Sequence, residues 1–299
     1  MTKLKARPPL EVKPGHTKGV LFGASGVGKT WFALSFPAPY YIDTEGGADL
    51  SHYMRRLKDS GGGYLGPEDG ACDFDTILEQ IQALATEKHG YKTLVIDSVT
   101  KVFQATIAKE AERLGDKDAF GASKKPAVGF MRRLTNWVNR IDMNVWFVAH
   151  ETAEWSGSGN DRTMVGKTAD VWDKLIYELD LTLRIERHSA KLRTATVMKS
   201  RLTGFPDADR FELQKDGVEV GYAAFAERYG KDFIEAEVQP IELATPEDVA
   251  EIERLLEVVK VAPADVEKAL NKANADSFKE LNRDQAVKMI DWLRKKVQA

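Results

Sequence analysis

The feature that most constrains this chain is a glycine-rich loop at residues 23–30. It reads GASGVGKT and fills every fixed position of the pattern GxxxxGK(S/T). The stretch KGVLF at 18–22 predicts a short buried strand before the loop, and a helix is expected to open at residue 31. Closely spaced glycines let the backbone turn so that successive N–H groups face an anion, and the following helix directs its positive end at the same point. The sequence therefore predicts a site for the phosphates of a nucleotide.

Two side chains of this loop have roles that follow from the placement. Lys29 is expected to reach the β- and γ-phosphates, and Thr30 to offer its hydroxyl to Mg²⁺. An apolar strand at 93–97 ends in a carboxylate, Asp97, which would hold the same Mg²⁺ through water. The predicted nucleotide-binding residues are Gly23, Ser25, Gly26, Val27, Gly28, Lys29, Thr30, Trp31 and Asp97, with Thr30 and Asp97 as the metal pair.

A second carboxylate follows another predicted strand. Residues 40–43 form a short strand, and Glu45 comes two residues after it. In an open α/β sheet, ligands bind outside the carboxyl ends of the strands. Glu45 is therefore a candidate base that orients an attacking water. The alternative is a glutamate that lies exposed on a turn.

Three further polar residues follow predicted strands. His150 ends a buried strand at 145–149, where it could hydrogen-bond the γ-phosphate and report its presence, or simply cap the strand. An alternating pattern then predicts a hairpin, with strands at about 178–187 and 192–199. Lys199 and Arg201 flank the end of its second strand. They could point at a phosphate or lie on a solvated rim.

Two polar stretches separate the predicted elements, at 115–127 and at about 151–172. The second is long for a loop inside a compact domain, and loops of that length are usually functional. We expect an irregular loop there. The two stretches contain the cations Lys124, Lys125, Arg162 and Lys167 and the aromatic residue Trp155. Cations in such loops usually only meet solvent.

Composition narrows the class of protein. The net charge is −3, so the chain is not basic overall and any contact with nucleic acid needs a local patch. The single cysteine, Cys72, excludes an internal disulfide and fits a reducing compartment. No apolar run approaches the length of a membrane span, and the first residues carry no hydrophobic signal segment. We therefore expect a cytoplasmic protein.

The chain divides into four predicted parts. Residues 1–17 are rich in Lys, Pro and Gly and predict an extended N-terminal arm. The strands and helices of an α/β core are expected within 18–230, followed by a linker at 231–243. The segment 244–299 predicts a small helical domain, because a threonine N-cap and a proline at the first helical position precede an apolar stripe.

With these motifs in place, the core resembles the RecA family. The phosphate loop, the turn with Glu45, the strand ending at Asp97 and the strand ending at His150 occur in RecA order. The resemblance implies ATP with Mg²⁺, a mainly parallel central sheet flanked by helices, and Glu45 as the residue that activates water. It implies that the two polar stretches bind single-stranded DNA, and that His150 occupies the sensor position, usually a glutamine. The candidate DNA contacts are then Lys124, Lys125, Arg162 and Lys167, with Trp155 as a residue on which a base could stack. Lys199 and Arg201 are similar to paired lysines that reach into a neighbouring subunit's ATP, with one lysine replaced by arginine.

The compact core is most similar to phage-encoded RecA-core proteins of the single-strand annealing type, the Sak-four group, and the C-terminal helices to small tails on phage recombination proteins. This resemblance implies an ATP-dependent recombination or annealing protein with DNA-stimulated ATPase activity. It would assemble as a filament or ring, with ATP between subunits, in the cytoplasm of a bacterial host. Its expected partners are single-stranded DNA, copies of itself and a single-strand DNA-binding protein, with no membrane. The expected catalytic residues are Lys29, Glu45, His150, Lys199 and Arg201.

Two other functions stay open on the sequence. A RecA-fold motor, such as a helicase or a packaging component, would couple ATP hydrolysis to movement along DNA. A nucleotide switch would bind a protein partner and no DNA, with the C-terminal helices as its adaptor. The absence of a strongly basic composition keeps the switch open.

Overall fold

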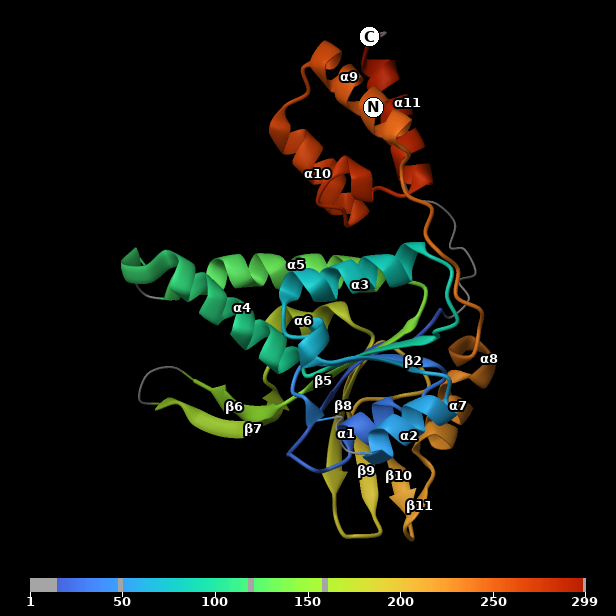
Figure 1. The fold of residues 1–299 in the computed structure, drawn as a ribbon. Coiled ribbons are helices and arrows are strands. Elements are labelled where there is room, and N and C mark those ends of the chain that lie inside the picture. The colour runs from blue at the N-terminus through green and yellow to red at the C-terminus, as the bar shows by residue number, and fades with distance from the viewer. Residues whose placement is uncertain (1–14, 48–50, 118–120, 158–160, 298–299) are drawn as a thin grey trace, which may run out of the picture.

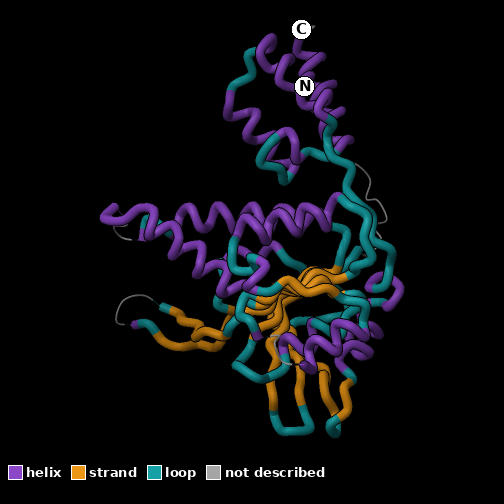
Figure 2. The backbone as a smooth tube through the Cα atoms, in the orientation of Figure 1, coloured by secondary structure: helices purple, strands orange, loops and turns teal. Residues whose placement is uncertain are grey.

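A nine-stranded sheet forms the centre of the molecule in this computed structural model (Figure 1). The structure describes residues 15–47, 51–117, 121–157 and 161–297, so the predicted N-terminal arm lies outside the described residues up to residue 14. The strand order is β11-β10-β9-β8-β1-β5-β4-β2-β3. Helices lie on both faces of the sheet (Figure 2).

The sheet is parallel in its larger part and antiparallel at one side. Parallel pairing joins six strands: β1 (Lys18–Phe22), β2 (Pro39–Asp43), β3 (Gly63–Leu65), β4 (Thr93–Asp97), β5 (Asn144–Ala149) and β8 (Leu181–Arg187). Antiparallel pairing adds three more: β9 (Arg193–Ser200), β10 (Arg210–Lys215) and β11 (Val218–Glu219). This confirms the predicted α/β class with a mainly parallel central sheet.

The central strands are buried on both faces, which explains their uninterrupted apolar sequences. Every residue of β4 and β5 is buried, as expected of parallel strands that helices cover from both sides. Two separate apolar clusters result. One packs under α3 (Phe74–Thr86), α4 (Val99–Leu114), α5 (Lys124–Arg140) and α6 (Asp173–Glu178), and the other under α1 (Lys29–Ala33), α2 (Ser51–Asp59), α7 (Gly221–Tyr229) and α8 (Lys231–Ile234).

Most described residues of the polar stretch at 151–172 form a β-ribbon, so the expected irregular loop is wrong for them. β6 (Glu151–Ser156) and β7 (Thr163–Ala169) pair antiparallel and project from the core beside α4 (Figure 1). Most residues of both strands are exposed or half-buried. A strand that buries neither face needs no apolar alternation, and the usual sequence signal of a strand is therefore missing.

The C-terminal helices form a group with its own apolar cluster. The group comprises α9 (Pro246–Val259), α10 (Pro263–Ala273) and α11 (Arg283–Val297), and its buried side chains contact one another. A capping box opens α9, since the Thr245 hydroxyl accepts from the Asp248 N–H and the Asp248 carboxylate accepts from the Thr245 N–H. The predicted C-terminal helical part is thus present.

Polar contacts join this helical group to the core. Arg133 of α5 lies 3.1 Å from a carboxylate oxygen of Glu280, and Arg140 donates to the Glu280 carbonyl at 2.5 Å. The segment expected as a linker begins with helix α8 and then follows the core, where the Ile241 N–H donates to the Ala85 carbonyl at 2.7 Å.

None of the helices in the described part of the chain combines the length and the apolar character that a membrane span requires.

Candidate functional site

The phosphate loop joins β1 to α1 in the conformation that its glycines permit. Gly23, Gly26 and Gly28 all have positive φ angles, of 148°, 72° and 102°, which side chains other than glycine rarely adopt. Gly23 also has no room for a side chain, because a Cβ there would lie 2.3 Å from the Ile185 carbonyl oxygen. The loop therefore depends on glycine for its shape, as the motif predicts.

Lys29 is folded over this loop. Its Nζ donates to the carbonyls of Gly23 and Ala24, both at 2.9 Å. Burial lowers the pKa of Lys29, and the negative charge of Asp97 acts in the opposite direction. Helix α1 has only five residues, so the positive charge of Lys29 and the loop N–H groups would attract an anion more than the dipole of a long helix would.

Thr30 and Asp97 meet at the metal position that the sequence predicts. The Thr30 hydroxyl donates to a carboxylate oxygen of Asp97 at 2.5 Å. Burial raises the pKa of Asp97 to about 6, against the effect of the Thr30 hydrogen bond. The neighbouring charges of Glu45 and Asp43 raise this pKa further, while Lys29 lowers it. A bound cation would compensate the buried negative charge of Asp97.

This donor set fits Mg²⁺ held together with a nucleotide. A hydroxyl and a carboxylate are hard oxygen ligands, and Mg²⁺ is usually held by one or two carboxylates, water and substrate phosphates. No cluster of three or more His, Cys, Asp or Glu residues that could hold a metal ion occurs in the described part of the chain. The residues therefore suit a metal that arrives with phosphate ligands of its own.

Glu45 and His150 lie in direct contact. His150 Nε2 is 2.6 Å from Glu45 Oε1, and the Ser98 hydroxyl donates to the same oxygen at 2.8 Å. The turn that carries Glu45 is fixed to the end of β4, because the Thr44 hydroxyl accepts from the Ser98 N–H at 2.8 Å. The His150 N–H donates to the hydroxyl of Thr100 at the start of α4, at 2.9 Å. The structure thus brings together two predicted catalytic residues from separate strands.

These groups share one cavity of about 770 Å³ with the phosphate loop. Its lining includes Lys29, Thr30, Glu45, Asp97 and His150 together with Gly23, Ser25 and Gly26, so eight predicted site residues face the same space. A volume of this order suits a small ligand such as a nucleotide. Glu45 and Lys29 face the same cavity. A water held by Glu45 could therefore approach a phosphate bound at Lys29.

Lys101 and Glu151 are among the lining residues of this cavity that the sequence analysis did not single out. Lys101 lies in the first turn of α4, four residues after Asp97, and adds a positive charge. Glu151 opens the ribbon and is 3.0 Å from Arg184. Lys101 could have been predicted from the sequence, because it follows closely after the strand that ends in Asp97. Glu151 could not have been predicted, since only the fold brings its partner Arg184 close to it.

Lys199 and Arg201 do not reach the phosphate loop of their own chain. Lys199 lies opposite Thr182 on β8, and Thr182 in turn lies opposite Val20 in the middle of β1, away from the end of β1 that leads into the phosphate loop. The Lys199 Nζ donates to the Leu179 carbonyl. The Arg201 guanidinium donates to the Tyr177 and Glu178 carbonyls at the end of α6. In this chain, therefore, both cations cap α6 rather than contact the nucleotide site.

The DNA candidates lie on two separate elements. Lys124 and Lys125 are exposed at the start of α5. On the ribbon, the Arg162 guanidinium lies over the Trp155 ring, 5.3 Å from its centroid, and the Trp155 side chain is 49% exposed. Lys167 is 3.4 Å from Glu151 at the base of the ribbon. The tip of the ribbon therefore carries an exposed aromatic ring with a cation, while Lys167 is paired.

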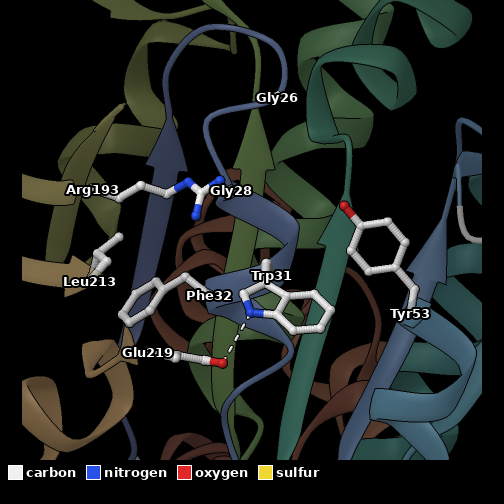
Figure 3. Close-up of a pocket in the computed structure, with 8 residues that line it drawn as sticks. All are labelled: Gly26, Gly28, Trp31, Phe32, Tyr53, Arg193, Leu213 and Glu219. Carbon is white, nitrogen blue, oxygen red and sulfur yellow. Dashed lines mark hydrogen bonds between the residues drawn. The ribbon is translucent and has the colours of Figure 1, made fainter. Parts of the chain in front are cut away.

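A second cavity, of about 200 Å³, adjoins the phosphate loop on the side of Trp31 (Figure 3). It shares Gly26 and Tyr53 with the larger cavity. Arg193 and Glu219 reach it from β9 and β11. Sequence reasoning identified Trp31 but missed these two residues, because they are more than 160 positions away and only the sheet topology brings them to the loop.

A comparison with known families finds a match for the core. The model of a family described as an AAA domain matches residues 16–210, well over half of the chain. The match begins just before β1 and includes every predicted site residue from Gly23 to Arg201. A comparison with curated proteins finds no match. The family match supports a P-loop ATPase core and does not distinguish the phage annealing group.

The buried Asp97 carboxylate predicts a pH dependence of stability in nucleotide-free protein. Its pKa of about 6 in the folded chain exceeds the ordinary value of 3.8, so the folded state binds this proton more tightly than the unfolded state. The free energy of unfolding should therefore fall by about 2 kcal/mol as pH rises from about 4 to about 7. Urea unfolding across this range measures the effect.

Asp97→Asn should remove this dependence and make the nucleotide-free protein more stable than wild type above pH 7. Asp291→Asn, at an exposed position of α11, is the matched control and should leave the pH profile unchanged. Mg²⁺ with a nucleotide should stabilise the wild type and the control but not Asp97→Asn. An Asp97→Asn profile that follows the wild type would show that Asp97 does not carry the effect.

Proposed function

The chain belongs to the AAA domain family of P-loop ATPases, and on that premise we propose that it is an ATP-dependent, single-stranded DNA-binding recombination or annealing protein of the Sak-four kind. One observation carries the proposal. The ribbon runs from His150 and Glu151 at the nucleotide cavity to the exposed ring of Trp155 and the Arg162 guanidinium at its tip. A change at the phosphates can therefore act on a surface suited to nucleic acid.

Hydrolysis would use the groups that line the larger cavity. The loop N–H groups and Lys29 bind the phosphates, while Thr30 and Asp97 hold the metal. Mg²⁺, when bound, neutralises charge on the phosphate oxygens. Glu45 accepts a hydrogen bond from the attacking water and orients it. The Ser98 hydroxyl, at 2.8 Å from Glu45, keeps that carboxylate in place.

The contact between His150 and Glu45 provides the link to the ribbon. The two side chains lie 2.6 Å apart, within hydrogen-bond distance. A γ-phosphate would compete for the His150 ring and leave Glu45 free to bind water. Thr100 fixes both ends of the ribbon, since its hydroxyl accepts from the His150 N–H and donates to the Asp170 carbonyl. Movement of His150 would therefore be transmitted to the ribbon.

The ribbon tip offers the chemistry that sequence-independent binding of single strands requires. Bases stack on exposed aromatic rings, and cations track the phosphates. Trp155 supplies such a ring and Arg162 a cation beside it. Lys124 and Lys125, exposed at the start of α5, would extend the contact along the strand. With a net charge of −3, the chain must bind through a local surface of this kind.

Assembly of several copies would give Lys199 and Arg201 a role in hydrolysis. Neither reaches the nucleotide of its own chain, yet both lie beside exposed apolar side chains: Tyr177 is 69% exposed and Met198 is 43% exposed. Such residues suggest a surface that another copy covers. We place the ATP of one copy against Lys199 and Arg201 of the next.

A protein-directed switch is the second candidate function. Met164 and Val165 lie on the ribbon near Trp155 and are 52% and 59% exposed. An apolar surface of this kind also suits a protein partner. In that case the ribbon would bind protein, not DNA, in response to the nucleotide.

Binding of a fluorescent single-stranded oligonucleotide tests the proposal. Affinity should be higher with a non-hydrolysable ATP analogue than with ADP, and should fall as salt rises because phosphate contacts release counterions. Trp155→Ala should weaken binding about tenfold by removing the stacking ring. Trp292→Ala, which removes a partly exposed ring on α11, is the control and should bind as wild type does. ATP hydrolysis without oligonucleotide binding in any nucleotide state would reject the DNA function in favour of the switch.

Mixing two inactive variants tests the placement of ATP between copies. Lys29→Ala cannot bind phosphates, and Arg201→Ala lacks the cation offered to a neighbour, so each alone should hydrolyse ATP at least 100-fold more slowly than wild type. A mixture should regain activity, because Lys29→Ala chains supply an intact Arg201 to the intact phosphate loops of Arg201→Ala chains. A mixture as inactive as its components would contradict an arginine acting on the neighbour's nucleotide.

A further inference from the structure

The small cavity beside Trp31 is formed by parts of the chain that are distant in sequence (Figure 3). Two glycines of the phosphate loop, Gly26 and Gly28, close one end, and the remaining lining comes from α1, α2, β9, β10 and β11. Its volume of about 200 Å³ is below the roughly 300–1,000 Å³ of pockets for drug-sized ligands. The cavity therefore suits one part of a nucleotide rather than the whole.

The direction of a bound nucleotide decides which part that is. Glu45, His150 and Lys29 line the larger cavity, and the proposed function assigns the γ-phosphate to the side of Glu45 and His150. Trp31 lines the small cavity, which shares Gly26 and Tyr53 with the larger one. A triphosphate with its β- and γ-phosphates at Lys29 can therefore continue past Gly26 into the small cavity. The group beyond the α-phosphate, the ribose with its base, then arrives at the small cavity.

We infer that this cavity receives the nucleobase, that Trp31 is its stacking wall, and that it selects the shape of a purine ring rather than the identity of the purine. The inference rests on the proposed nucleotide binding and extends it to the class of nucleotide. Arg56 and Glu219 are positioning residues, because they act on the base through Trp31.

The position of Trp31 is fixed by a polar clamp. Its Nε1 donates to Glu219 Oε2 at 3.0 Å, and Arg56 lies over the ring with its guanidinium carbon 4.1 Å from the centroid. Arg56 also donates to both carboxylate oxygens of Glu219, one of them at 2.9 Å. Two-point ion pairs of this geometry are stronger and more directional than single contacts. The ring therefore cannot rotate without breaking the clamp.

Because the clamp occupies most of the Glu219 carboxylate, few groups of the cavity remain to hydrogen-bond the edge of a base. A carboxylate has about four acceptor positions, and three on Glu219 are occupied by Trp31 and Arg56. Arg193 is tied to Gln214, and its unused N–H groups could donate to ring nitrogens that adenine and guanine both carry. Phe32 and Leu213 add only apolar surface, and the hydroxyl of Tyr53 can donate or accept, so it does not distinguish the amino group of adenine from the carbonyl of guanine.

Weak edge reading has a measurable consequence. Sites that hydrogen-bond a distinguishing group reject the analogue without it by about 10⁴–10⁵-fold, while shape alone gives about 10–200-fold. ATP and GTP should therefore bind within about fivefold of each other. CTP should bind about tenfold more weakly than either, because a pyrimidine covers less of the Trp31 ring.

The test measures dissociation constants for non-hydrolysable ATP, GTP and CTP analogues and for tripolyphosphate, each with Mg²⁺. Tripolyphosphate has the phosphates without a base. Trp31→Ala should weaken ATP and GTP analogues about tenfold and change tripolyphosphate less than twofold. Glu219→Gln should weaken the purine analogues about threefold, and should add nothing in a Trp31→Ala background, since it acts through the ring. Glu227→Gln, an exposed glutamate of α7, is the matched control.

The inference would be overturned if wild type preferred the ATP analogue over the GTP analogue by more than 100-fold. It would also be overturned if Trp31→Ala left ATP affinity unchanged, or weakened tripolyphosphate as much as it weakened the ATP analogue. Wild type that binds no triphosphate would reject both the inference and the proposed function. The nucleotide assay contains no DNA, so the other outcomes separate the two proposals. If nucleotides bind as described but the protein binds no DNA, only the DNA function is rejected. If DNA binding depends on nucleotide but Trp31→Ala leaves nucleotide affinity unchanged, only the base cavity is rejected.

Discussion

The parallel register of four strands is the constraint on which the site depends. Asp43 at the end of β2 lies opposite Asp97 on β4, and Asp97 lies opposite Val148 on β5, while Phe22 on β1 lies opposite Ala149. All four strands therefore finish at one edge, and the polar residues that follow them converge there. A shift of one residue would turn the side chains of that strand to the opposite face. The apolar residues that cover both faces of the sheet thus also position the polar site.

Much of this site could be predicted because its residues follow local rules. A phosphate loop after a strand and carboxylates at strand ends are patterns within a few residues, and the structure places Lys29, Thr30, Asp97, Glu45 and His150 around one cavity. The parallel sheet and the C-terminal helices follow from apolar runs and capping residues for the same reason.

Other features could not be predicted because they depend on contacts between distant segments. Arg193 and Glu219 reach the phosphate loop only through the antiparallel strands that extend the sheet. The ribbon was missed because it buries neither face and so lacks the alternation that identifies a strand. The hydrogen bonds of Lys199 and Arg201 to the end of α6 likewise follow from packing, not from their spacing in sequence.

The central claim is that nucleotide at the phosphate loop acts on the ribbon through His150. Amide hydrogen exchange of residues 151–157 and 161–169 measures this directly, without DNA or a partner. With Mg²⁺ and a non-hydrolysable ATP analogue, exchange in the ribbon should differ from that with ADP, and the difference should disappear in His150→Ala. Equal exchange with both nucleotides in wild type, while the phosphate loop becomes protected, would contradict the claim.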